Sequence, residues 1–231
     1  DCLSTWDVAI EKQSALINAL TDRKKALMQQ LLTGKKRLPG FSDEWKEVKL
    51  GEIAKTFSGG TPKSTIKEYY IGNIPFIKSG EINSTQTEQF INEEGIKNSS
   101  AKKVNKGDLL YALYGATSGT VGISNIDGAI NQAVLCIRTK ENKFYLFYLL
   151  DYLKQNIINS FLQGGQGNLS SKIINELNIN IPTISEQTAI AAILATADRE
   201  LQLQKEKLAQ LQTQKKGLMQ VLLTGKKRLI N

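Results

Sequence analysis

The stretch KKALMQQLLTGKKRL at residues 24–38 returns almost unchanged as KKGLMQVLLTGKKRL at residues 215–229. Thirteen of the fifteen positions are identical, at an offset of 191 residues. Because so long a match does not arise by chance, the chain contains an internal duplication. This duplication is the strongest constraint that the sequence places on the fold.

Both copies, with the residues before them, carry apolar side chains at a seven-residue period. Such heptads predict two long helices that pack as a coiled coil. The two seams agree even in their polar interruptions, Gln13 with Gln204 and Lys24 with Lys215, and polar seam residues fix register. Since the first helix leads into the middle of the chain and the second leads out of it, we expect an antiparallel pair. Each helix of about 31 residues would be a rod of ~45 Å.

The ends of the predicted helices carry their own signals. Gly34 and Gly225 are suited to C-terminal caps, and the cations after them favour the negative end of the helix dipole. In the second copy Ser185 is the predicted N-cap, and Glu186 lies in the first turn. The chain therefore divides into a helical segment 1–40, a globular domain 41–184 and a second helical segment 185–231.

The middle of the chain predicts a globular domain of mixed texture. Short β-type runs alternate with loops rich in Gly, Ser, Thr and Asn. One helix, with apolar residues at helical spacing, is expected at 143–161. The fold class is therefore α/β, with one globular domain flanked by two long helices that form an antiparallel coiled coil. The expected strands are 74–77, 109–114, 120–124, 133–138 and 177–181.

Composition excludes several classes of function. The chain has no histidine, which removes Ser-His-Asp and Cys-His catalysis and most zinc sites. Cys2 and Cys136 match no metal-ligand spacing, so we expect two free thiols in a reducing cytoplasm. No apolar run approaches the ~18 residues of a membrane span, and no signal peptide is visible. A cytoplasmic protein without a membrane partner is expected.

The net charge of +8 lies mainly at the two ends of the chain. Segment 1–40 carries +3 and segment 185–231 carries +4, whereas the domain 41–184 carries +1. A basic protein suggests a polyanionic partner, although lysines at a helix C-terminus also serve as solvated caps.

Several stretches resemble catalytic loops without their full patterns. Residues 73–76, NIPF, resemble the Asn-Pro-Pro-Phe loop of adenine methyltransferases, but no glycine-rich cofactor loop follows a strand. Neither 33–35 nor 60–64 has the G-x-x-x-x-G-K-[ST] spacing that wraps a phosphate. The glycine-rich run 114–122 predicts a turn between two strands. No catalytic and no metal-ligating residues are therefore predicted.

Polar loops at 58–63, 78–81 and 164–172 are better suited to reading DNA bases. Gln and Asn can form two hydrogen bonds with adenine, and Lys can bind guanine or phosphate. Glycine lets the backbone approach a duplex. For any single residue, an ordinary solvent-exposed loop is the alternative. The residues predicted to contact DNA are Gly60, Thr61, Lys63, Lys78, Ser79, Tyr114, Ser118, Gln166, Asn168, Ser170 and Lys172.

These motifs together give the chain a resemblance to the specificity subunits of type I restriction-modification systems. The duplicated L-M-Q-x-L-L-T-G-K-K-R-L endings and the I-P…S-E-Q entry at 181–187 carry it most strongly. In the middle, SGGTP at 58–62, IPFI at 74–77 and NQA at 131–133 look like family landmarks. The resemblance implies two target-recognition domains alternating with two such helices, each domain reading half of a split DNA site.

The resemblance also implies a division of labour among chains. Separate modification subunits would bind S-adenosylmethionine and methylate adenine, and a restriction subunit would use ATP and Mg²⁺, so this chain needs no cofactor. Double-stranded DNA and both subunits are the expected partners, and a homodimer is left open.

This sequence holds only one recognition domain, so an excised fragment and a short gene product are both open. A scaffold or decoy that binds modification subunits without reading DNA, and a DNA methyltransferase, are the alternatives. The sequence does not give the target bases.

Overall fold

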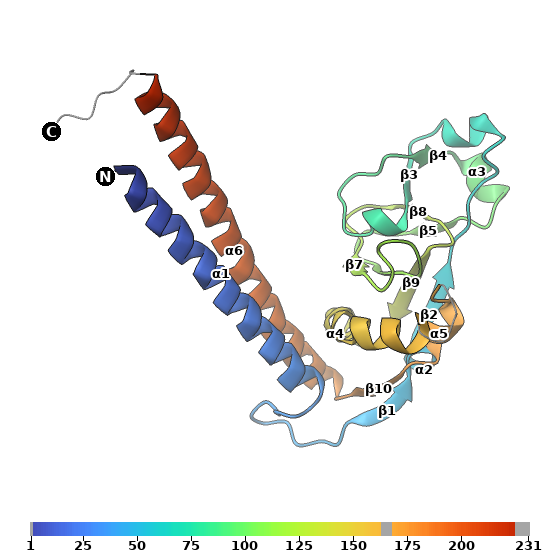
Figure 1. Cartoon of the computed structure of the whole chain (residues 1–231). Coiled ribbons are helices and arrows are strands. Elements are labelled where there is room, and N and C mark those ends of the chain that lie inside the picture. Colours follow the sequence, from blue (N-terminus) through green and yellow to red (C-terminus); the bar gives the residue numbers. More distant parts are fainter. Residues whose placement is uncertain (1, 163–167, 225–231) are drawn as a thin grey trace.

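Two long helices lie side by side and lead away from a globular domain (Figure 1). The computed structural model describes residues 2–162 and 168–224. Helix α1 spans Cys2–Leu32, and helix α6 spans Ile184–Leu223. The predicted pair of long helices around a mixed domain is confirmed. At 40 residues, α6 is longer than the expected ~31, because it begins at Ile184, before the position that corresponds to the start of α1 at the offset of 191. The domain limits 1–40, 41–184 and 185–231 stay a prediction.

Polar residues fix the register of the antiparallel coiled coil. Gln13, only 6% exposed, donates from Nε2 to Oε1 of Gln204 at 2.8 Å and to its carbonyl oxygen at 3.1 Å. On one side of this pair Lys24 binds Asp198, and on the other Lys215 binds Asp7. Residue numbers therefore rise on one helix as they fall on the other, as expected for a first helix that leads into the middle of the chain and a second that leads out of it.

The duplication gives the coiled coil a local twofold symmetry. At the offset of 191, Asp7 corresponds to Asp198 and Lys24 to Lys215, so the two ion pairs are one contact made twice. The Gln13–Gln204 contact joins two corresponding residues, as expected near a twofold axis.

The two ends of the coiled coil differ in what covers them. At the domain end, the Tyr148 hydroxyl donates to Asp198 at 2.8 Å, and Lys24 lies 5.6 Å from the Tyr148 ring. Met28 is consequently only 7% exposed, whereas its repeat equivalent Met219 is 37% exposed. The same apolar surface is thus buried at one end and open to solvent at the other, within the described part of the chain.

The globular domain is built on two four-stranded sheets. The first has the order β2-β9-β6-β7 and is antiparallel throughout. The second has the order β4-β3-β8-β5, with β3 and β8 parallel. The strands are β1 (Lys46–Lys49), β2 (Ala54–Ser58), β3 (Ile74–Ile77), β4 (Phe90–Ile91), β5 (Lys102–Val104), β6 (Leu109–Ala112), β7 (Val121–Ile123), β8 (Gly128–Ile130), β9 (Val134–Thr139) and β10 (Asn178–Ile181).

Helix α4, Lys143–Leu162, connects the domain core to the coiled coil. It contacts both α1 and α6, and its Tyr145 and Leu146 are fully buried. This confirms the helix predicted at 143–161. The short helices are α2 (Leu50–Ile53), η1 (Lys67–Tyr70), η2 (Ser79–Glu81), α3 (Glu93–Lys97) and α5 (Ser171–Asn175). No helix in residues 2–162 and 168–224 is long and apolar enough to cross a membrane.

The start of α6 differs from the prediction. Thr183, not Ser185, is the N-cap, because Pro182 holds the preceding backbone extended and the helix begins directly after it. Thr183 makes no capping bond through its side chain. Its hydroxyl instead lies 3.1 Å from that of Ser185.

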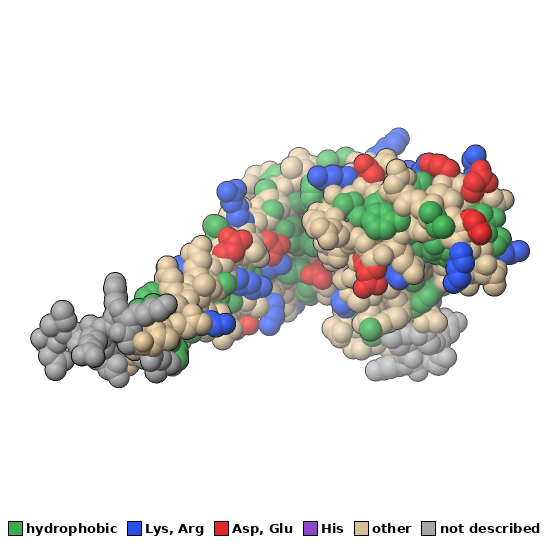
Figure 2. All heavy atoms as spheres, turned by 90° about the horizontal axis from the view of Figure 1, so that it is seen from above, with side chains coloured by type: hydrophobic (Ala, Val, Ile, Leu, Met, Phe, Trp, Pro, Cys, Tyr) green, Lys and Arg blue, Asp and Glu red, His purple; other side chains and the backbone are tan. Residues whose placement is uncertain are grey.

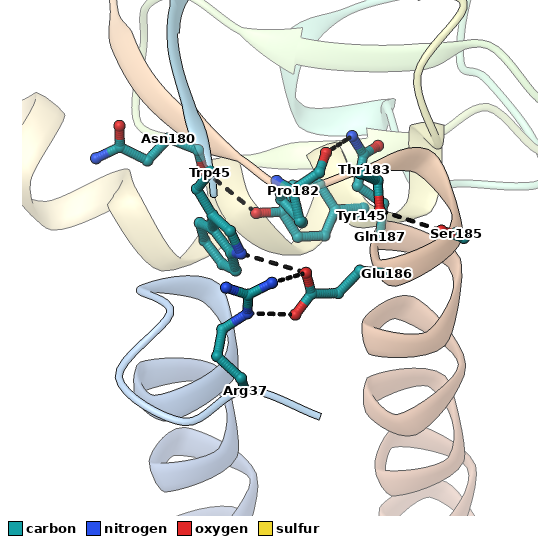
Figure 3. A network of polar contacts seen from close by, with 9 residues as sticks. All are labelled: Arg37, Trp45, Tyr145, Asn180, Pro182, Thr183, Ser185, Glu186 and Gln187. Carbon is teal, nitrogen blue, oxygen red and sulfur yellow. Dashed lines mark hydrogen bonds and ion pairs between the residues drawn. The ribbon is translucent and has the colours of Figure 1, made fainter. Parts of the chain in front are cut away.

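A buried ion pair joins the first helical segment to the start of α6 (Figure 3). Arg37 donates from its guanidinium to both carboxylate oxygens of Glu186, at 2.8 and 2.7 Å. Trp45 donates from Nε1 to the same carboxylate at 3.3 Å. Glu186 is 1% exposed, so the Arg37 guanidinium compensates its charge and the Trp45 indole NH adds a hydrogen bond. Arg37, which follows the turn at Gly34, therefore links the end of the first helical segment to the start of α6.

Candidate nucleic-acid interface

Polar loops far apart in the sequence converge at one region of the domain. The backbone NH of Gly59 donates to the Asn131 carbonyl at 3.2 Å, which ties the loop after β2 to the segment between β8 and β9. The NH of Leu113, after β6, donates to the Ala133 carbonyl at 2.8 Å. The loop after β6 and the loop after β2 therefore both meet the short segment 131–133.

Side chains reinforce this convergence. The Thr61 hydroxyl donates to Gln132 Oε1 at 2.7 Å. Tyr114 lies beside the Gln132 side chain; burial raises the pKa of its phenol, and the interaction with Gln132 opposes the rise. Two predicted contact residues, Thr61 and Tyr114, thus meet at one exposed glutamine.

The predicted turn after β6 is confirmed and lies beside η2. Strands β6 and β7 are antiparallel neighbours, and Gly115 and Gly119 in their connection have φ angles of +92° and +78°. Residues with a side chain rarely adopt such positive φ angles, so glycine is required at both positions. A Cβ added to Gly115 would lie 3.7 Å from Ser79 Oγ. Ser79 is thereby placed next to the loop that carries Tyr114.

The structure places the other predicted residues in different ways. Gly60 is buried, and a Cβ on it would meet Ser100 at 2.6 Å, so it supports the loop from inside. The hydroxyls of Ser118 and Ser170 are engaged with the backbone, at the Leu113 carbonyl and at the N-cap of α5. Gln166 lies outside the described residues. The exposed candidates are Thr61, Lys63, Asn168, Ser170 and Lys172, and DNA contact at every predicted position stays a prediction.

Charge is dispersed over the domain. Lys78 Nζ lies 4.0 Å from Glu88 Oε2, a long and largely exposed ion pair. Lys and Arg side chains alternate with Asp and Glu over the domain surface seen in Figure 2. This agrees with the charge of only +1 over residues 41–184.

A groove of ≈ 720 Å³ next to Thr61 contains residues that sequence reasoning missed. It is lined by Lys67 and Gln89 together with two exposed apolar side chains, Ile71 (73% exposed) and Phe90 (41% exposed). Solvated Ile and Phe side chains on one groove are typical of an interaction site. They belong to η1 and β4 and to the turns beside them, which carry no periodic signal in the sequence.

The stretches set aside as catalytic are structural. Residues 74–77 form β3, in which Phe76 is 2% exposed, so NIPF is not an open loop. Cys136 is a free thiol, and burial raises its pKa to about 12, which makes it a poor nucleophile. In residues 2–162 and 168–224 no three His, Cys, Asp or Glu side chains are grouped to hold a metal ion.

Comparison with known proteins identifies the architecture. Residues 42–213 match the family described as the type I restriction modification DNA specificity domain. The chain belongs to this family. Two curated specificity subunits match nearly the whole chain or most of it. The type I restriction enzyme MjaVIII specificity subunit of Methanocaldococcus jannaschii is 26% identical over 99% of this chain and 59% of its own length. The EcoR124I/EcoR124II specificity subunit of Escherichia coli is 26% identical over 82% of this chain and 50% of its own length.

Solved members of the family share the fold. The type I restriction-modification S subunit from M. genitalium superposes with a TM-score of 0.67 at 18% identity. The match covers 94% of this chain and 57% of that one. This specificity-domain chain therefore spans between 50% and 59% of the length of these relatives.

Proposed function

We propose that the chain is a non-catalytic specificity subunit that reads one half of a bipartite site on double-stranded DNA. The observation that carries this is the convergence of the loops at 58–63, 79, 113–120 and 131–133 on one exposed polar region. Family membership supports the same reading. A domain held rigidly by α4 against a coiled coil would present this region at a fixed distance and angle.

Affinity and specificity would come from different parts of the complex. Phosphate contacts position a protein on DNA, and base contacts select the sequence. The nearly neutral domain offers amides and hydroxyls for base edges. The basic helical segments, and the partner subunits, would supply most of the attraction to phosphates.

We propose modification and restriction subunits as partners, with S-adenosylmethionine, ATP and Mg²⁺ bound on them, in the cytoplasm. The exposed faces of α1 and α6 are the docking platform in this proposal. A rod of about 45 Å is comparable with one DNA turn of ~34 Å plus the width of a half-site, which suits a spacer between two reading sites.

We expect the pure chain to enrich one sequence motif from duplexes with a randomised central segment. Its affinity should fall steeply with salt because phosphate contacts release counterions. It should show no methyl transfer, ATP hydrolysis or DNA cleavage, since its described residues bring no catalytic group together. Selection with sequencing, and turnover assays on the same preparation, test both statements.

Three outcomes would contradict the proposal. Reproducible turnover by the chain alone would favour a methyltransferase. If the chain binds modification subunits but shows no preference for a DNA sequence, either alone or together with these subunits, a scaffold is favoured. If the chain enriches DNA ends or DNA shapes without a sequence motif, it does not read bases.

A homodimer would cover the open end of the coiled coil. Met219 corresponds in the repeat to Met28, which is buried at the other end of the coiled coil. Two copies that packed these ends together would bury both exposed surfaces in one isologous contact. We expect a dimer by sedimentation, and Met219→Glu should weaken it about tenfold or more because a charge enters an apolar contact. Leu203→Glu is the control, since Leu203 is 55% exposed on the same helix outside the repeated motif. A wild-type monomer at all concentrations rules out the dimer.

A further inference from the structure

The segment 131–133 holds an exposed side chain on an unusually fixed backbone. Asn131 Oδ1 accepts from the Ala133 NH at 3.0 Å, and its carbonyl accepts from Gly59. The adjoining residues Ile130 and Val134 are fully buried. Gln132 lies between them and is exposed. The backbone that carries it is therefore held by hydrogen bonds between two buried strand residues.

The Gln132 side chain is fixed as well. The Thr61 hydroxyl donates to its Oε1 at 2.7 Å, and Tyr114 lies beside it. Glutamine is among the side chains with the most rotamer freedom to lose. The bond from Thr61 already restricts this freedom. A ligand that binds the amide therefore loses less conformational entropy.

Counting hydrogen-bond capacity shows what the amide still offers. A carboxamide has two acceptor positions on oxygen and two donor hydrogens on nitrogen. Thr61 uses one position on Oε1. One acceptor position and the donor hydrogens of Nε2 remain on this exposed residue. The major-groove edge of adenine presents the complementary pair, the N6 donor and the N7 acceptor.

We propose that Gln132 is a base-reading residue that selects an adenine in the major groove, and that Thr61 and Tyr114 position its amide. This inference rests on the proposed function and specifies one of its contacts. Thr61 is a positioning residue here, because its hydroxyl is directed at Gln132 and not at the duplex. The Ser79 hydroxyl beside Gly115 lies close enough to this region to share the same half-site.

The test is motif selection from randomised duplexes with the full chain and four variants. In Gln132→Ala, one adenine of the wild-type motif should lose about tenfold in preference, as expected for the loss of a bidentate base contact, while the other positions keep theirs. Gln132→Glu removes the donor and leaves acceptors, so the same position should shift toward cytosine. Thr61→Val should weaken preference at that position alone, by less than Gln132→Ala. Gln210→Ala, an exposed glutamine on α6, should change nothing.

The outcomes separate this inference from the proposed function. If the wild-type chain selects a motif and Gln132→Ala selects the same motif with equal strength at each position, Gln132 is not a reader and the inference is overturned. If the wild-type chain selects no motif, base reading by the domain fails, and the inference fails with it. A uniform loss of affinity in Gln132→Ala, with the motif intact, assigns Gln132 to loop stability and also overturns the inference. Thermal unfolding of each variant checks that the fold is retained.

Discussion

Gly59→Ala should unfold the globular domain or destabilise it by about 3 kcal/mol or more. A Cβ on Gly59 would lie 1.7 Å from the Ile130 carbonyl oxygen and 2.5 Å from its carbon. Both are backbone atoms of a buried strand, so no side chain can rotate away to make room. The φ angle of Gly59 is not positive, and the cost is therefore steric, not conformational. Chemical denaturation followed by far-UV circular dichroism measures it.

Gly80→Ala is the matched control for this substitution. Gly80 lies in another of the predicted reading loops, and a Cβ on it would meet nothing within 4 Å. Its effect on stability should stay within about 0.5 kcal/mol. Equal stabilities for the two variants would show that the loop after β2 does not pack on the segment after β8. The convergence on which the proposed interface depends would then be absent.

The long-range pairing of the two helices could be predicted because the information is redundant. Each heptad repeats the same instruction, and the duplication adds a second copy with the same interruptions at Gln13 and Gln204. The structure confirms the pair and its orientation. The strand at 74–77 was also recognisable, because a short run of apolar residues between polar residues is typical of a buried strand.

Other strands gave no local signal. β1 reads KEVK, with only Val48 partly buried, and it exists because it pairs along its length with β10, more than a hundred residues away. β4 has two residues. β5 presents two exposed lysines and one buried valine. Tertiary pairing decides such segments, and local propensity does not reveal it.

The candidate interface could be predicted only in part, because its contacts also join residues that are far apart in the sequence. Composition identified the loops, since Gly, Ser, Thr and Lys between strands favour exposed turns. It could not show that Thr61 meets Gln132, 71 positions later. It also could not show that the Ser118 hydroxyl donates to the Leu113 carbonyl. The N-cap bond at Ser170 could have been found from the sequence, because serine commonly makes such local bonds with the backbone.

Arg37→Ala should lower the thermal midpoint by about 6 °C or more, and by more than Glu186→Ala. Removing Arg37 leaves the 1% exposed Glu186 carboxylate with Trp45 Nε1 alone, at 3.3 Å (Figure 3). Removing Glu186 instead frees a guanidinium whose side chain is 29% exposed and can reach water. A stranded buried charge costs more than a stranded charge that can be hydrated.

The double variant and one control complete this test. Replacing both Arg37 and Glu186 by Ala should cost less than the sum of the single changes, because no buried charge then remains. Arg23→Ala is the matched control, since Arg23 is 66% exposed and lies 3.6 Å from Glu200, which is 44% exposed, and such surface pairs contribute little. Differential scanning calorimetry with Trp fluorescence follows the transition. If Arg37→Ala and Arg23→Ala shift the midpoint equally, the Arg37–Glu186 pair does not hold the start of α6 against the first helical segment, and the angle between the domain and the coiled coil is set by α4 alone.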